Sequence, residues 1–435
     1  MEFAVLFGLV FTIYALSPVI ASGDSRWSVP VAHSILHEGN TNLDEFPDLL
    51  KGCDYYWADE INGHWYNRFP VGMPVLSIPP VAAAEVLLKL LFWLMPSLET
   101  RLAASASVPL ESVDVISIYW RVELYAASAY TALSALFVYS LARRRLPVGY
   151  ALAIVAAYTF CMPPWATGSR SLGQHGGSML MLAIALDLML LADRSPRLAG
   201  LAGLPLAFSF VIRPTNAIPI VCLTVLMALR QPRALRPLLL WALPVVIPFA
   251  LYNWSVYDAL LSPYYLPAKQ LGREARPMEA ALGLLVSPGR GLLIFTPLVC
   301  CGVYGVWRAC RARRNALAWL TLPLIAALHY AVLTTFGDWW GGHSYGPRYF
   351  SDLSPLFAAM LIPFFEAFQE STPRAKRALA ALFLLCASFG FFTQAAGACS
   401  LKSWEWNRVP NDINLNPARL WDWRDPSFLR WWKIV

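Results

Sequence analysis

The sequence alternates between long apolar runs and shorter polar segments along almost its whole length. A helix that crosses the roughly 30 Å hydrocarbon core of a bilayer needs about 20 apolar residues. Eleven runs approach that length, so the pattern predicts an all-α polytopic membrane protein with about 11 transmembrane helices. The predicted spans are residues 3–21, 118–142, 148–166, 172–192, 198–213, 215–230, 237–254, 290–308, 316–336, 353–369 and 377–397.

A further apolar run, residues 72–95, is long enough to cross a membrane but has a different character. It contains three prolines together with Glu85 and Lys89. Ionisable side chains are costly at membrane depth. We therefore predict that this run lies along the membrane surface.

The basic residues support this count of spans. With residues 72–95 at the surface, every strongly basic loop falls on one side of the membrane, beginning with the three arginines at 143–145. An excess of Lys and Arg marks the cytoplasmic side. The predicted topology has a cytoplasmic N-terminus and a transmembrane core over residues 1–397. Its first outer loop, residues 22–117, carries interfacial helices, and residues 398–435 form a Trp-rich periplasmic tail.

The composition agrees with a membrane protein. Hydrophobic residues make up 57% of the chain and charged residues only 14%, which excludes an ordinary soluble domain. The net charge of +7 does not indicate nucleic-acid binding, because the basic clusters are short and lie between apolar runs. The eight cysteines show no metal-binding spacing. Only Cys53 and Cys399 fall in predicted outer segments, and their pairing stays open.

Polar residues gather at the predicted outer ends of the helices. The first is Asp24, directly after the first apolar run. Several ionisable groups that converge on one leaflet suggest a functional site. Four further stretches share this placement: 171–176 (SLGQHG), 213–216 (RPTN), 287–291 (SPGRG) and 340–349 (WGGHSYGPRY).

An Asp after the first helix, a long outer loop with interfacial helices and these four stretches resemble the C-type glycosyltransferase (GT-C) superfamily. Its relatives include protein O-mannosyltransferases and lipid A aminoarabinose transferases. The resemblance covers nearly the whole chain and implies a polyprenyl-phosphate sugar donor. It also implies a catalytic aspartate in the first outer loop, which matches Asp24. Many relatives have Asp-Glu where this chain has Asp24-Ser25, so a metal role of the second acid does not carry over.

The implied transfer needs a base for the acceptor hydroxyl and cations for the leaving phosphate. Asp24 is the predicted general base, and direct attack would invert the anomeric centre. Guanidinium groups suit phosphate because they offer several fixed donors; the predicted phosphate ligands are Arg348, Arg290, Arg170 and Arg213. The predicted substrate contacts are His343, His175, Tyr264, Trp340 and Lys269. A divalent cation is a possible cofactor, with Asp59 and Glu60 as candidate ligands.

Several of these residues also have a purely structural interpretation. Asp24 fits a solvated loop acid, Arg348 a helix-end anchor to lipid headgroups, and His175 a hydrogen-bonded packing histidine. The Trp-rich tail fits an interfacial lid or anchor.

Three functions stay open. The leading one is a glycosyltransferase of a bacterial inner membrane that transfers a single sugar to a periplasmic acceptor, namely a lipid-linked glycan, lipid A, a polysaccharide or a protein such as a pilin. A transporter or flippase of a lipid-linked saccharide should instead carry polar groups at mid-membrane, often in repeated halves. An oligosaccharide ligase with a lipid-pyrophosphate donor would need cations for its leaving phosphate group, as the first function does.

Overall fold

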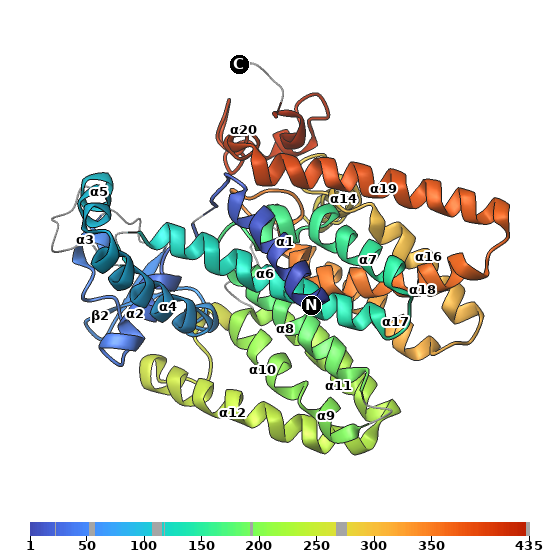
Figure 1. Ribbon diagram of the computed structural model, residues 1–435, viewed down its shortest axis with the longest axis horizontal. Coiled ribbons are helices and arrows are strands. Elements are labelled where there is room, and N and C mark those ends of the chain that lie inside the picture. The colour runs from blue at the N-terminus through green and yellow to red at the C-terminus, as the bar shows by residue number, and fades with distance from the viewer. Residues whose placement is uncertain are drawn as a thin grey trace.

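The computed structural model describes residues 1–21, 23–51, 57–106, 115–116, 118–191, 195–266 and 276–431. Over these residues the chain forms a bundle of helices with the first loop at one end (Figure 1). The bundle helices are α1 (Glu2–Leu16), α6 (Tyr119–Arg143), α7 (Val148–Cys161), α8 (Gln174–Met189), α9 (Pro196–Gly200), α10 (Gly203–Ile212), α11 (Ala217–Arg230), α12 (Pro232–Tyr257), α14 (Pro277–Val286), α15 (Leu292–Phe295), α16 (Leu298–Arg311), α17 (Ala316–Leu333), α18 (Ser354–Glu370) and α19 (Pro373–Cys399).

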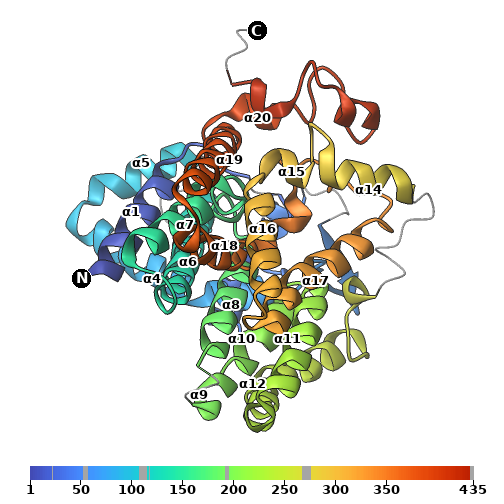
Figure 2. The ribbon, with the colours of Figure 1, turned by 90° about the vertical axis from the view of Figure 1, so that its right-hand side faces the viewer.

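All eleven predicted spans coincide with helical segments, so the predicted fold class is confirmed. Among the described residues, six helical segments are long and apolar enough to cross a membrane: α4 (Gly72–Leu94), α6, α12, α17, α19 and Arg348–Glu370. Shorter apolar helices accompany them. In Figure 2, α9 to α12 lie on one side of the molecule, and α19 and α20 (Leu401–Glu405) lie on the opposite side.

Two predicted spans each divide into two α-helices. Residues 290–308 divide into α15 and α16 at Thr296-Pro297, because a proline has no N–H to donate to the preceding turn. Residues 198–213 divide into α9 and α10. The backbone of α12 packs directly against this break, since a Cβ built on Gly203 would lie only 1.9 Å from the carbonyl oxygen of Leu238.

The first loop contains short elements that cover one end of the bundle. Helices α2 (Ser28–His37), α3 (Pro47–Leu50) and α5 (Pro96–Ala106) accompany α4 and a hairpin of β1 (Ala58–Ile61) and β2 (His64–Asn67). The strands are antiparallel, with Ala58 opposite Asn67. Asn62 and Gly63 join them with positive φ angles of 54° and 82°, which are typical of a tight hairpin turn.

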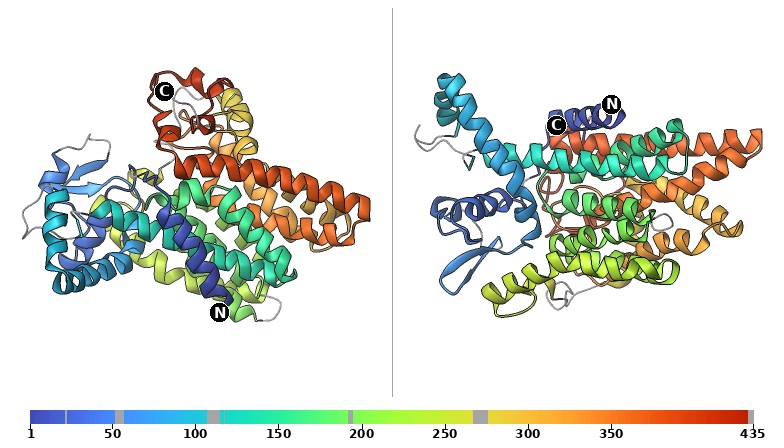
Figure 3. Two further views of the ribbon diagram at one scale, coloured as in Figure 1. Left: turned by 45° about the horizontal axis from the view of Figure 1, so that its top comes forward. Right: turned by 60° about the horizontal axis from the view of Figure 1, so that its bottom comes forward.

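Helix α4 differs in direction from the bundle. In the right-hand view of Figure 3 it is inclined to α6, α12 and α19 at the end of the bundle. Helix α2 packs against it, and Val29 and Ala32 of α2 share an apolar cluster with Met73 and Val81 of α4.

The two ends of the bundle differ in charge. Helix α18 begins beside the loop that carries Arg348 and ends at Glu370, about 26 Å away at 1.5 Å per residue. At the Glu370 end, arginines of the basic turns that follow α6 and α16 form ion pairs with acidic residues. These pairs are Arg144–Asp187 (2.8 Å), Arg145–Glu366 (2.8 Å) and Arg314–Glu370. The basic turns therefore gather at one end, whereas the first loop lies at the other (Figure 1).

Candidate functional site

A cavity of about 1210 Å³ opens at the end of the bundle that the first loop covers. Segments that are far apart in the sequence form its walls, among them the turn at residues 23–24, the start of α8, the turn after α10, residues 336–349 and α20 with the residues after it. Its aromatic lining residues are Trp57, Phe69, Phe210, Tyr264, Tyr265, Phe336, Tyr345, Tyr349 and Trp404. Such rings can stack on a sugar or contact a prenyl chain.

The segment that carries Asp24 is anchored on both sides. Before it, the backbone N–H of Ala21 donates to the carbonyl of Arg170 (3.1 Å). After it, the hydroxyl of Ser28 donates to the carbonyl of Leu172 (3.0 Å), and the side chain of Trp27 is fully buried. The 170–172 segment therefore fixes where the Asp24 carboxylate enters the cavity.

Asp24 forms a salt bridge with Arg348, and both side chains are about a quarter exposed, at 28% and 26%. These residues lie 324 positions apart in the sequence. The Nε–H of Arg348 also donates to Nε2 of His175 (3.2 Å). Because Nε2 is then an acceptor, a neutral His175 carries its hydrogen on Nδ1, which faces Oδ1 of Asp352 at 3.2 Å.

Asp352 is fully buried and has a charged neighbour besides His175. Nε of Arg213 lies 3.0 Å from its Oδ2. That contact is an ion pair without hydrogen-bond geometry, since the same N–H donates to the hydroxyl of Thr215 (3.0 Å). Asp24, Arg348, His175, Asp352 and Arg213 thus form one continuous network in which each acid contacts an arginine.

Two predicted phosphate ligands lie elsewhere. Arg170 is fully buried and donates to the carbonyls of Ser17 (2.8 Å) and Val19 (3.3 Å) just after α1. Arg290 is buried as well and donates to the carbonyls of Trp340 (2.8 Å) and Gly342 (3.1 Å) and to the side chain of Asn407 (2.7 Å). Neither side chain lines the cavity, so both hold loops that surround it.

The predicted substrate contacts divide in a similar way. His175, His343 and Tyr264 line the cavity, whereas Trp340 does not and instead donates to Asn414 (2.9 Å). Lys269 lies outside the described residues, as does Cys53, whose pairing with Cys399 was left open. The hydrogen bond between Nε2 of His343 and Asp412 (2.9 Å) lowers the pKa of that carboxyl below its ordinary value of 3.8.

Neither candidate metal ligand of the sequence lines the cavity. Asp59 on β1 pairs with Arg68, and Glu60 is the next residue of the same strand. Within the described part of the chain, the cavity brings no three His, Cys, Asp or Glu ligand atoms within 4.8 Å of one another. The described residues around Asp24 therefore do not fit a metal ion.

The sequence alone assigned no role to two residues of the site. Asp352 follows the 340–349 stretch but could not be told from a helix-capping acid. Arg408 belongs to the tail, yet it lines the cavity with Trp404 and Asn407. The dense polar sequence of the tail, 402–412, was the available signal.

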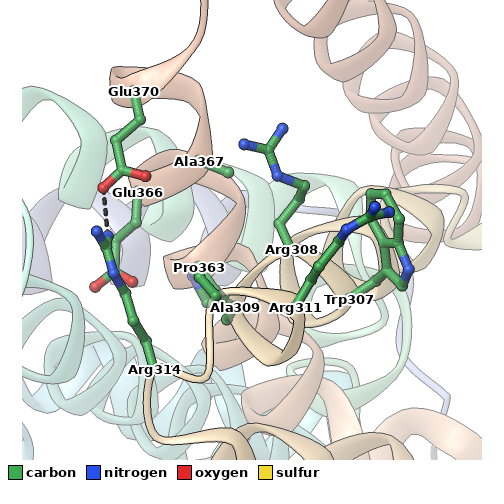
Figure 4. Close-up of a pocket in the computed structure, with 10 residues that line it drawn as sticks. Trp307, Arg308, Ala309, Arg311, Arg314, Pro363, Glu366, Ala367 and Glu370 are labelled. Atoms are coloured by element: carbon green, nitrogen blue, oxygen red, sulfur yellow. Dashed lines mark hydrogen bonds and ion pairs between the residues drawn. The ribbon is translucent and has the colours of Figure 1, made fainter.

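A second, smaller cavity of about 410 Å³ lies at the basic end of the bundle (Figure 4). Arg314 pairs there with Glu370, and the guanidinium of Arg311 lies 5.6 Å from the centre of the Trp307 ring. It is remote from Asp24, because α18 separates the two ends.

These features define the class of fold: the chain is a multi-pass helical membrane protein with the GT-C fold, and the resemblance seen in the sequence is confirmed at this level. No protein-family model matches the sequence, and no curated protein matches it. Several solved structures do match its fold.

ArnT from Cupriavidus metallidurans bound to undecaprenyl phosphate matches with a TM-score of 0.54 and 14% identity, over 99% of this chain and 74% of ArnT. The Archaeoglobus fulgidus oligosaccharyltransferase, in complex with Zn and sulfate, matches with a TM-score of 0.54 and 12% identity, over 97% of this chain. The oligosaccharyltransferase AglB from Archaeoglobus fulgidus, in complex with an inhibitory peptide and a dolichol-phosphate, gives a TM-score of 0.51 at 14% identity. This chain spans about 57% of the oligosaccharyltransferase chain.

Proposed function

We propose that this protein is a membrane glycosyltransferase that transfers a single sugar from a polyprenyl-phosphate donor to an acceptor hydroxyl. One observation carries the proposal, namely the meeting of Asp24 and Arg348 in a large cavity with aromatic walls. The undecaprenyl phosphate and dolichol-phosphate named for the two similar structures fit such a donor.

In the proposed reaction, Asp24 accepts the proton of the acceptor hydroxyl. The acceptor oxygen forms a bond to the anomeric carbon while the bond from that carbon to the phosphate oxygen breaks. The leaving polyprenyl phosphate takes the electron pair, and the anomeric centre is inverted. A carboxylate has an ordinary pKa of about 3.9, so its effectiveness depends on the partial desolvation that the cavity supplies.

Arg348 is the proposed principal phosphate ligand, because negative charge grows on the phosphate as it leaves. In the structure its guanidinium contacts Asp24, so a bound phosphate would compete for it and leave Asp24 free to accept a proton. Arg408 is the proposed second ligand. It lines the same cavity.

The arrangement of charges supports an active site at the outer face of a bacterial inner membrane. The basic turns lie at the opposite end of the bundle from Asp24, and basic residues concentrate on the cytoplasmic side. Lipid-linked glycans, lipid A, polysaccharides and proteins such as pilins are the acceptor classes to test. The polar network at one end of the bundle also favours a transferase over a flippase, whose site should lie at mid-membrane.

The test of the base uses purified protein with radiolabelled polyprenyl-phosphate sugars and candidate acceptors. We expect Asp24→Asn to reduce kcat by at least about 100-fold, since general-base catalysis contributes about 10²–10⁴-fold. Asp59→Asn is the matched control, because Asp59 lies in the same loop but pairs with Arg68 outside the cavity. Normal turnover by Asp24→Asn would remove this residue from the mechanism.

The donor class needs a separate measurement. Monophosphate-linked single sugars and pyrophosphate-linked oligosaccharides are supplied in parallel, each with the same acceptors. Turnover with the monophosphate donor supports the transferase. Turnover with the pyrophosphate oligosaccharide alone would replace it with the ligase.

A further inference from the structure

Three potential metal ligands meet in the first loop, away from the cavity that contains Asp24. His33 and His37 lie on α2, and Glu85 lies on α4. One ligand atom from each of the three side chains lies within 4.8 Å of the other two. None of the three side chains lines the large cavity.

The spacing of the two histidines suits a shared ligand. Residues four apart on a helix point from the same face, and a His-x-x-x-His pair on one helix is a recurrent zinc-binding arrangement. The two imidazole rings lie 4.3 Å apart, centre to centre. The packing of α2 on α4 then brings Glu85 opposite that face.

The two histidine-to-glutamate distances are close to those of a tetrahedral ion. Zinc–nitrogen and zinc–oxygen bonds of about 2.0–2.1 Å place neighbouring ligand atoms roughly 3.3–3.4 Å apart. Nε2 of His37 lies 3.1 Å from both carboxylate oxygens of Glu85, and Nε2 of His33 lies 3.8 Å from Oε1. Small side-chain adjustments would therefore bring all three atoms into coordination.

The position of Glu85 also needs a physical reason. It lies on α4, one of the helices apolar enough to cross a membrane, and its side chain is only 17% exposed. A largely buried carboxylate is costly without a specific partner. Two imidazoles that share a cation with it would supply one.

We propose that His33, His37 and Glu85 bind one divalent transition-metal ion, zinc in the first instance, with water as the fourth ligand. Imidazole together with carboxylate suits Zn²⁺, whereas Mg²⁺ and Ca²⁺ prefer oxygen ligands alone. His37 is 45% exposed at its side chain, which leaves an entry route and room for the water. The ion would cross-link α2 to α4, and α2 begins four residues after Asp24.

The test uses the full-length protein, purified in detergent without a histidine tag and stripped with EDTA. After dialysis against limiting Zn²⁺, bound metal is measured by elemental mass spectrometry. We expect one zinc per chain in the wild type. We expect His37→Ala and Glu85→Gln to bind zinc at least about 10-fold more weakly, because loss even of an outer-shell partner costs 10–100-fold.

His64→Ala is the matched control, since His64 lies in the same loop and pairs with Asp44 instead; its zinc content should equal that of the wild type. Glu85→Gln tests the alternative of a purely hydrogen-bonded cluster, because Gln retains hydrogen bonding to His37 while losing the charge. An absence of zinc in the wild type, or wild-type zinc affinity in either Glu85→Gln or His37→Ala, would overturn the proposal.

Two measurements on the wild-type protein test the proposal even where a variant does not fold. Co²⁺ bound by these ligands should give visible absorption bands that added Zn²⁺ removes, and Zn²⁺ should raise the midpoint of thermal unfolding. A wild-type protein without either response does not contain the site.

Discussion

Replacement of Arg213 by Met should show how strongly the buried network stabilises the candidate site. The Asp352 carboxylate is fully buried, and the side chain of Arg213 is only 7% exposed. Met has a similar length to Arg but carries no charge, so the substitution leaves Asp352 without its nearest cation.

The expected loss of stability follows from the contacts. Removal of one partner of a buried ion pair costs about 3–5 kcal/mol, because the remaining charge is left uncompensated. Asp352 keeps its contact with Nδ1 of His175 at 3.2 Å, so we expect about 3 kcal/mol, at the lower end. The Arg68–Asp59 pair is the matched control; its side chains are 36% and 44% exposed, and Arg68→Met should cost less than about 1 kcal/mol.

The assay is the free energy of unfolding in mixed micelles, followed by tryptophan fluorescence as denaturing detergent is added. A double-mutant cycle with Asp352→Asn separates the pair from its surroundings. The double variant removes both charges. Its loss of unfolding free energy should therefore be smaller, by about 1–3 kcal/mol, than the sum of the losses in the two single variants. If Arg213→Met costs no more than Arg68→Met, or if the double variant shows simple additivity, the network does not stabilise the site.

Two further predictions concern the tail and the packing of the bundle. Because the pKa of Asp412 is lower in the folded protein than its ordinary 3.8, the hydrogen bond from His343 contributes above that value and is lost as the pH falls through the folded pKa. Hydrogen exchange of residues 400–431, corrected for intrinsic rates, should therefore accelerate below about pH 4 in the wild type; an equal change in Asp412→Asn would contradict this. A Cβ on Gly305 would lie 2.3 Å from the backbone nitrogen of Phe364, so Gly305→Ala should cost about 1–3 kcal/mol by overpacking. Gly149 has no atom within 4 Å of that position, and Gly149→Ala should change stability by less than about 0.5 kcal/mol.

The helices could be predicted well because their signal is local. A run of apolar residues predicts a span wherever it occurs, and each predicted span coincides with helical segments. The hairpin at 58–67 was missed, although Asn62-Gly63 is a strong turn signal. Its strands have only four residues each, too few for an alternating pattern to stand out.

The site was predictable only in part because it depends on contacts between distant segments. Asp24 and Arg348 were identified from position and resemblance, but only the fold brings them together. Arg348 was the favoured phosphate ligand, but Arg170 and Arg290 remained candidates because all three lie near predicted helix ends. Whether a guanidinium faces a cavity or backbone carbonyls depends on the path of the neighbouring loop, which composition does not encode. Arg408 could not be identified from the sequence for the same reason.

Arg290 donates hydrogen bonds to the carbonyls of Trp340 and Gly342 and to the side chain of Asn407. Because Asn407 belongs to the tail, this wall of the cavity forms only once the tail has been made. Arg408 is made 384 residues after Asp24, so at about 5–20 residues per second a ribosome needs roughly 20–80 s to reach it. Throughout that interval the growing chain lacks the wall that the tail supplies. Asp24 therefore meets its complete surroundings only after nearly all the helices have been made.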